Sequence, residues 1–130
     1  YYLTEERMNY LKENYKDKVK ENTEKMFEDI KRIDENGCEF WYVRELQHVL
    51  EYKNWRNFNK VIDKAIISAN TSYPNQNLWG VEVNTPISSG KGKIEMIKDY
   101  KLSRYACYLI AQNGDSRKKV IALAQTYFAI

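Results

Sequence analysis

The chain has 130 residues and a formal net charge of +3, with 43% hydrophobic and 30% charged residues. This length suits one domain with a single hydrophobic core. No stretch approaches the roughly 18 apolar residues of a membrane-spanning helix, so we expect no membrane partner and a cytoplasmic location. The two cysteines, Cys38 and Cys107, have no metal-binding spacing, and we expect neither a metal nor another cofactor.

The positive charge is unevenly distributed along the chain. Residues 1–36 carry eight basic and ten acidic side chains, a net charge of −2. Residues 37–77 carry five and four, a net charge of +1, and residues 78–130 carry eight and four, a net charge of +4. A basic excess of this size suits an anionic partner without requiring one.

Residues 3–26 predict a long, mostly charged helix that begins near Thr4. Its apolar residues form a stripe one residue wide: Met8, Leu11, Tyr15, Val19 and Met26. So narrow a stripe cannot stabilise an isolated helix, and we expect it to pack on the rest of the chain, with a coiled-coil seam as the alternative. We therefore divide the chain into an amphipathic helical extension, residues 1–26, and a domain, residues 27–130.

The first half of this domain predicts a short hairpin followed by two helices. Asn36-Gly37 is a strong two-residue turn signal between apolar residues. The helices, residues 43–50 and 55–69, are separated by about four residues, which is a helix-turn-helix outline. After them we expect a loop at 70–77, a strand at 78–83, a flexible loop at 85–93 and a strand at 94–102.

The stretch from Leu102 to Ile130 predicts two apolar helices joined by a tight turn. Ser103 is the expected N-cap, Asn113-Gly114 the left-handed stop, and Asp115-Ser116 the next N-cap. The second apolar face continues to the last residues, so we expect a fragment of a longer protein. These elements predict the α+β class: mainly helical, with short antiparallel strands and a helix-turn-helix-like pair.

The second helix of the helix-turn-helix outline carries basic and amide side chains opposite its apolar face. The first residues of a recognition helix contact base edges, where Arg and Asn suit guanine and adenine, while Lys contacts phosphate. An ordinary solvated helix face shows the same pattern. The candidate DNA-binding residues here are Lys53, Asn54, Arg56, Asn57, Lys60 and Lys64.

Two further basic groups are candidates for phosphate contacts. The loop with Lys91 and Lys93 fails the P-loop test, because Ile87 replaces the first glycine and Ile94 replaces the Ser or Thr. A basic, glycine-containing loop still suits a nucleic-acid backbone, like the wing of a winged helix, and a disordered loop is the alternative. The second group occupies the expected first turn of the last helix, where the helix dipole disfavours positive charge: Arg117, Lys118 and Lys119.

We find no set of residues with the spacing of a catalytic site. His48 is the single histidine and follows Glu45 by three residues, without a nearby Ser or Cys nucleophile, so a structural role is favoured. We therefore expect a protein that is not an enzyme. Tyr52 and Trp79 are the aromatic residues best placed to stack on unpaired bases.

Three motifs resemble a known family: Trp41-Tyr-Val-Arg-Glu-Leu, the stretch Leu50–Ala65, and Leu102–Asp115 with Ala124-Gln-Thr-Tyr-Phe-Ala. Across residues 27–130 the chain resembles the bacterial DNA-damage-inducible protein D family, which is related to the BRO-type N-terminal domain. The resemblance implies a small α+β domain, a DNA-linked role in the damage (SOS) response, no catalytic residues, and a longer protein. By position and chemistry it transfers five DNA-binding candidates: Arg44, Lys53, Arg56, Asn57 and Lys60.

We therefore predict a non-catalytic DNA-binding domain of a DNA-damage response protein that modulates repair or recombination. Whether single- or double-stranded DNA is bound stays open. The alternative is a protein-interaction module that docks on a repair or recombination protein. Self-association into a homo-oligomer through the apolar surfaces is a further case.

Overall fold

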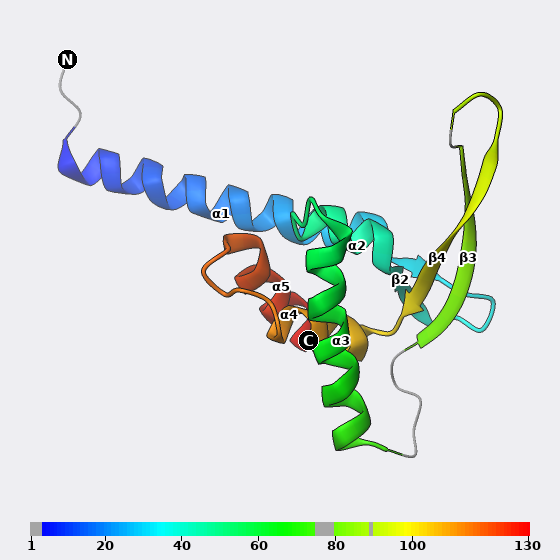
Figure 1. The fold of residues 1–130 in the computed structure, drawn as a ribbon. Coiled ribbons are helices and arrows are strands. Elements are labelled where there is room, and N and C mark those ends of the chain that lie inside the picture. Colours follow the sequence, from blue (N-terminus) through cyan, green and yellow to red (C-terminus); the bar gives the residue numbers. More distant parts are fainter. Residues whose placement is uncertain (1–3, 75–79, 89) are drawn as a thin grey trace.

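The computed structural model describes residues 4–74, 80–88 and 90–130, without the side chains of residues 11–20 and Thr85. It confirms the α+β class, with helices packed beside a small antiparallel sheet (Figure 1). In chain order the elements are α1 (Glu5–Ile30), β1 (Arg32–Ile33), β2 (Glu39–Tyr42), α2 (Val43–Val49), α3 (Trp55–Ser72), β3 (Gly80–Ser88), β4 (Ile94–Leu102), α4 (Arg104–Gln112) and α5 (Lys119–Ala129).

Two long elements project from the body of the fold. The C-terminal end of α1 packs on α2 and α5, and α3 packs on α4. Figure 1 shows the N-terminal part of α1 extending away from the other helices. The β3–β4 hairpin extends in another direction. Of the helices within the described residues, none has both the length and the apolar composition that a membrane crossing needs.

The sheet is antiparallel, with the strand order β1-β2-β4-β3. The predicted short hairpin is confirmed, since Arg32 pairs with Phe40, but its loop is longer than the predicted two-residue turn: Asp34 N–H donates to the Cys38 carbonyl. Asp34 Oδ1 accepts hydrogen bonds from the N–H groups of Asn36 and Cys38. Gly37 supplies the positive φ of 79° that this turn requires. The register of the longer hairpin runs from Gly80 opposite Leu102 to Ser88 opposite Ile94.

Strand β3 of the second hairpin continues farther than the sequence indicates. The strand predicted at 94–102 is confirmed, and so is the predicted strand from Gly80 onward, but residues 78 and 79 lie outside the described residues. The flexible loop expected at 85–93 is wrong for 85–88, because β4 supplies these residues with a pairing partner. Pro86 is tolerated because β3 is an edge strand, where a missing N–H need not interrupt the ladder.

Helices α2 and α3 confirm the two helices predicted at 43–50 and 55–69. The N-cap of α3 is Asn54, and its buried face consists of Phe58, Ile62, Ala65 and Ala69. The loop expected at 70–77 is wrong for 70–72, which continue α3, and residues 75–77 lie outside the described residues. The helix-turn-helix assignment itself stays a prediction, since α3 makes its main helix contact with α4.

The turn between α4 and α5 differs from the predicted one. Ser103 caps α4 as expected, but Asn113 has a φ of −90°, so the left-handed stop is wrong. Asn113 instead donates from its side-chain Nδ2 to the Leu109 carbonyl at 2.8 Å. Gly114 packs closely on Ile121, since an added Cβ would lie 3.0 Å from Cγ2 of that residue and would require its side chain to shift.

The predicted N-cap of the last helix is also displaced. Asp115 Oδ1 accepts the backbone N–H of Arg117 at 3.0 Å, and this carboxylate caps a turn that precedes the helix. Since α5 begins at Lys119 with Lys118 as its N-cap residue, the three basic residues do not share its first turn.

An aromatic cluster joins the end of α1 to the rest of the core. Trp41 and Phe27 are fully buried, and the indole N–H of Trp41 donates to the Phe27 carbonyl at 3.0 Å. The Phe128 ring packs on both, with its centroid 5.3 Å from that of Phe27 and 5.1 Å from that of Trp41. Phe27 therefore makes the contact that we expected from the apolar stripe.

The predicted stripe is wrong where its side chains are described, because Met8 and Met26 are 45% and 47% exposed. The side chains of Leu11, Tyr15 and Val19 lie outside the described part of the structure. Helix α1 crosses positions 26 and 27 without a break. The division into 1–26 and 27–130 stays a prediction.

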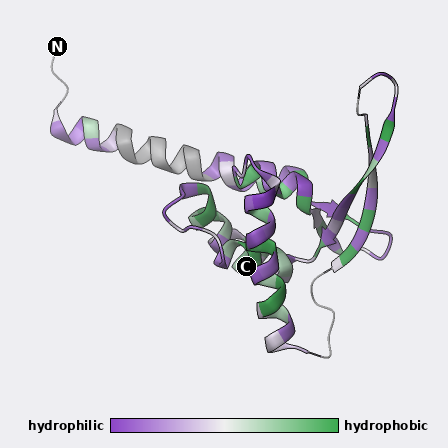
Figure 2. Ribbon diagram, viewed as in Figure 1, coloured by the Kyte–Doolittle hydropathy of each residue, from purple (hydrophilic) through white to green (hydrophobic). Residues whose placement is uncertain are grey.

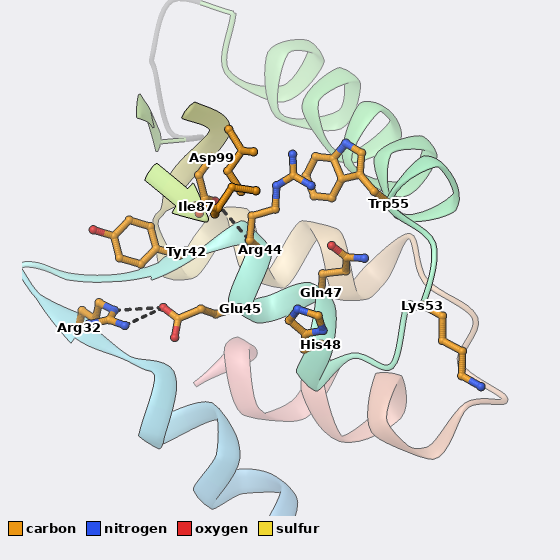
Figure 3. Close-up of a pocket in the computed structure, with 11 residues that line it drawn as sticks. Arg32, Tyr42, Arg44, Glu45, Gln47, His48, Lys53, Trp55, Ile87 and Asp99 are labelled. Atoms are coloured by element: carbon orange, nitrogen blue, oxygen red, sulfur yellow. Dashed lines mark hydrogen bonds and ion pairs between the residues drawn. The ribbon is translucent and has the colours of Figure 1, made fainter. Parts of the chain in front are cut away.

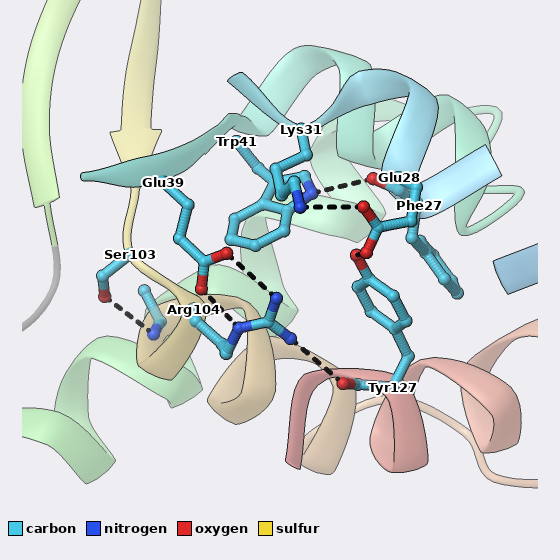
Figure 4. A network of polar contacts seen from close by, with 9 residues as sticks. Phe27, Glu28, Lys31, Glu39, Trp41, Ser103, Arg104 and Tyr127 are labelled. Atoms are coloured by element: carbon cyan, nitrogen blue, oxygen red, sulfur yellow. Dashed lines mark hydrogen bonds and ion pairs between the residues drawn. The ribbon is translucent and has the colours of Figure 1, made fainter. Parts of the chain in front are cut away.

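A polar network covers one side of the aromatic cluster (Figure 4). Arg104 forms a two-point ion pair with Glu39, with Nη2 at 3.1 Å from Oε2, and donates through Nη1 to the Tyr127 carbonyl. The Tyr127 hydroxyl donates to Glu28, which also pairs with Lys31. Hydrogen bonds from Arg104 lower the pKa of Glu39, while burial raises the pKa of Tyr127, helped by its bond to Glu28.

We expect the Glu39–Arg104 pair to make stability depend on acid pH. Because the folded-state pKa of Glu39 lies below its ordinary value, the contribution is present above that value and is lost as the pH falls through the lowered pKa. Lowering the pH from about 6 to about 3 should therefore lower the melting temperature of the unmodified chain more than that of the Glu39→Gln variant. Thermal unfolding at each pH measures both. Parallel curves for the two proteins would contradict a role of this ion pair in stability.

Gly80 should tolerate no side chain. Its φ is 150°, and an added Cβ would lie 2.0 Å from the Lys101 carbonyl oxygen of β4. We expect Gly80→Ala to lower the free energy of unfolding by more than about 1 kcal/mol. Gly37→Ala is the control, because Gly37 also has a positive φ but has no atom within 4 Å of the added Cβ. Equal losses in chemical denaturation would show that the contact with β4 is unimportant.

Candidate nucleic-acid interface

A cleft of about 700 Å³ lies between α2 and the β3–β4 hairpin (Figure 3). One side of it is formed by residues of β1, β2 and α2, another by the start of α3, and the third by the hairpin. The lining residues are Arg32, Tyr42, Arg44, Glu45, Gln47, His48, Lys53, Trp55, Ile87, Ile97 and Asp99. The cleft therefore combines cationic, aromatic and aliphatic side chains.

Arg44 lies at the junction of the three sides. Its guanidinium carbon is 3.6 Å from the ring centroid of Trp55, a cation–π contact at the start of α3. Its Nε donates to the Lys98 carbonyl of β4 at 3.1 Å. No hydrogen bond from its Nη1 or Nη2 to any described residue is present. The side chain is thus held in one orientation, with the two terminal nitrogens free to bind an anion.

Asp99 fixes the backbone beneath Arg44. This carboxyl group is 4% exposed, and its Oδ1 accepts the backbone N–H groups of Arg44 and Tyr100 at 3.2 and 2.8 Å. The bond from Arg44 attaches the first turn of α2 to β4, while the bond from Tyr100 lies within β4 and orients the carboxylate. Asp99 therefore sets where the Arg44 side chain starts and aligns the hairpin with α2.

The charges of the lining leave two cations without a carboxylate partner. Arg32 pairs with Glu45 at 2.9 Å, so that its charge is compensated. Within the described residues, neither Arg44 nor Lys53 forms an ion pair. Three cations and two carboxylates line the cleft, giving a formal charge of +1 with His48 neutral. This arrangement suits an anionic ligand.

The turn between α2 and α3 positions Lys53 at the cleft. Tyr52 N–H donates to the Gln47 carbonyl and Glu51 N–H to the His48 carbonyl, which is a Schellman motif. Glu51 occupies its left-handed position with a φ of 62°. The Gln47 side chain, 7% exposed, donates to the Tyr52 carbonyl at 3.0 Å and holds the turn closed.

The structure divides the predicted DNA-binding residues into separate groups. Arg44 and Lys53 line the cleft. Asn54 lies next to it, but its Oδ1 accepts the N–H groups of Arg56 and Asn57 as the α3 cap. Four predicted residues are exposed on α3, away from its buried face: Arg56, Asn57, Lys60 and Lys64.

The other predicted basic residues lie farther along the chain. Lys91 and Lys93 are exposed at the hairpin turn, where Lys93 N–H donates to the Gly90 carbonyl. Arg117 pairs with Asp115 at 2.9 Å. Lys118 donates to the Glu51 carbonyl at 3.3 Å and lies 4.3 Å from the Tyr52 ring centroid, while Lys119 is exposed. Arg117 and Lys118 therefore already have partners within the fold.

Sequence reasoning missed several residues of the cleft. Trp55 begins the apolar face of α3, yet it is half-buried and supports Arg44. His48, assigned a structural role, is exposed in the lining, and Glu45 pairs with Arg32 instead of with it. The hairpin residues Ile87 and Ile97 gave no signal, because only the strand register brings them to α2.

The two aromatic residues proposed for base stacking fare differently. Tyr52 is not a free platform, because its ring packs on Phe58 at 4.9 Å and on Lys118. Trp79 lies outside the described residues. Within the described part of the chain, no three His, Cys, Asp or Glu side chains are grouped so that they could hold a metal ion.

Comparison with known proteins places this geometry in a family context. Residues 29–129 match the family described as the BRO family, N-terminal domain. Over 104 residues the chain is 42% identical to the DNA damage-inducible protein D of Escherichia coli (strain K12), an alignment that covers 80% of this chain. The aligned part is 38% of the length of that relative. No solved structure matches the chain significantly.

The turn that positions Lys53 should become more stable when its left-handed residue is glycine. A non-glycine residue in this conformation costs about 1 kcal/mol, so we expect Glu51→Gly to raise the free energy of unfolding by about that amount. Lys118 contacts the backbone carbonyl of Glu51, and this bond is retained. Glu51→Ala is the control and should give no comparable gain in urea denaturation. A gain of the same size in both variants would assign the effect to the glutamate side chain.

Proposed function

Because the chain belongs to the BRO family and carries its N-terminal domain, we propose that it is a non-catalytic DNA-binding domain. The observation that carries the proposal is the cleft with Arg44 and Lys53, two cations without carboxylate partners among the described residues. The name of the 42% identical relative supports a role in the response to DNA damage, where we place the protein in the modulation of repair or recombination. A cytoplasmic location is part of the proposal.

The proposed contacts start in the cleft and extend to neighbouring surfaces. Arg44 and Lys53 would bind phosphate oxygens, since cationic side chains supply most of the affinity for a nucleic-acid backbone. Lys91 and Lys93 would add contacts from the hairpin turn. The exposed face of α3, from Arg56 through Asn57 and Lys60 to Lys64, offers a second basic surface.

The basic residues before α5 are weaker candidates. The charge of Arg117 is compensated by Asp115, and Lys118 is held by the Glu51 carbonyl and the Tyr52 ring. Lys119 is the exposed member of the group. We therefore assign these residues a supporting role and place the main contact at the cleft.

One observation favours a protein partner as the second candidate function. Ile94 and Met96 are 74% and 61% exposed on the hairpin, although such side chains are usually buried. Figure 2 shows apolar residues interspersed with polar ones along this projecting element. A docking surface for a repair or recombination protein, or for a second copy of the chain, would cover them. Pull-down from damaged cells with and without nuclease separates the two functions, because partners held through DNA are lost after nuclease treatment.

We expect Lys53→Ala to weaken DNA binding and to reduce its salt dependence. Each lost phosphate contact should make the slope of log K against log salt concentration less steep by about 0.7 to 0.9. Lys25→Ala removes the same charge from an exposed position on α1 and should leave the slope unchanged. Titration of labelled single- and double-stranded DNA at several salt concentrations measures both.

The proposal fails if the chain shows no saturable DNA binding at low salt, or if the two lysine variants behave alike. Its non-catalytic part is tested by incubating the same DNA with magnesium or manganese ions. DNA cleavage at a rate that increases with the concentration of this protein would show that it is a nuclease.

A further inference from the structure

We propose that the cleft between α2 and the β3–β4 hairpin holds an unpaired nucleotide of single-stranded DNA. The base would lie against the apolar wall of the cleft, and the phosphates would contact Arg44 and Lys53. This inference rests on the proposed DNA-binding function and narrows it to a substrate class and a site. It is carried by the combination of an apolar wall and a cationic edge in one recess.

The apolar wall comes from two elements that the strand register brings together. Ile97 is opposite Thr85 and Ile87 is opposite Glu95, which places both isoleucines on one face of the hairpin. Both line the cleft, and Trp55 and Tyr42 line it from the helical side. Ile87 is 39% exposed, so the wall is accessible to a ligand.

The cationic edge is fixed in position before a ligand arrives. The Trp55 ring supports the Arg44 guanidinium at 3.6 Å, and the Lys98 carbonyl holds its Nε. The remaining fork of Nη1 and Nη2 matches two oxygens of one phosphate group. Because the side chain is already ordered, binding costs less conformational entropy than it would with a free arginine.

The wall argues for an unpaired base instead of a duplex. In a duplex the bases are stacked inside and the backbone presents phosphates and sugars, so that an apolar wall gains little from contact with it. Unpaired bases expose flat apolar faces that stack on aromatic rings and on arginine. The volume of about 700 Å³ lies within the range of pockets that enclose small organic ligands.

The base contribution can be measured with matched oligonucleotides. A labelled twelve-residue thymidine oligonucleotide and an abasic oligonucleotide of equal length carry the same phosphates, but only the first carries bases. We expect the unmodified chain to bind the thymidine oligonucleotide about fivefold more tightly or better, which corresponds to one stacked base. Equal affinities would overturn the inference.

Two hairpin variants locate the contact. Ile87→Ser removes part of the apolar wall and should abolish the preference for the thymidine oligonucleotide. Ile94→Ser is the matched control: Ile94 pairs with Ser88, so it lies on the opposite face of the same hairpin. It should keep the full preference. Both positions are exposed, and circular dichroism verifies that each variant is folded.

The outcomes separate this inference from the proposed function. If both variants keep the preference, or if both lose it equally, the cleft is not where bases bind. If the chain binds a duplex of the same length as tightly as the thymidine oligonucleotide, DNA binding stands and the single-strand assignment falls. If no DNA of any kind binds at low salt, the proposed function itself fails.

Discussion

The fold depends on one buried hydrogen bond and the aromatic rings around it. The Trp41 indole donates to the Phe27 carbonyl, which satisfies the polar atom of a fully buried side chain and anchors the last turn of α1 to β2. Phe128 of α5 packs against both rings, and Arg104 lies 5.1 Å from the Trp41 centroid. Removing Trp41 would expose a carbonyl and empty the space that three helices share. The contacts of Glu28 and Phe27 with Tyr127 and Phe128 lie beside this point.

Helices were predicted well because their signals are local. The apolar spacing from Phe58 to Ala69 and the cap at Ser103 depend only on neighbouring residues, and both are confirmed. The strand at 85–88 was missed since its glycine- and serine-rich surroundings resemble a loop, and only pairing with β4 makes it a strand. The start of α5 was misplaced because Asp115 caps an earlier turn, a choice that also depends on Arg117.

The candidate site was harder to predict than the fold. Composition indicated cations, and Arg44 and Lys53 are among them, but sequence gave no reason to join them to Ile87 or Ile97. Arg44 contacts α3 through Trp55 and β4 through Lys98, so its environment comes from three elements that are separated in the chain. Arg44 is thus held in one orientation, whereas the lysines of α3 are exposed to solvent. The distinction becomes visible only once the register of β3 and β4 is known.

The bond between Tyr127 and Glu28 joins residues 99 positions apart. Phe128, one residue farther, completes the aromatic cluster that Phe27 begins. A chain emerging from the ribosome therefore lacks the α5 partner of α1 until nearly all of the domain has been synthesised. Contacts of such large sequence separation form late and slow the folding of small domains. The side of Phe27 that Phe128 covers would stay exposed for that interval, a period in which a chaperone can bind it.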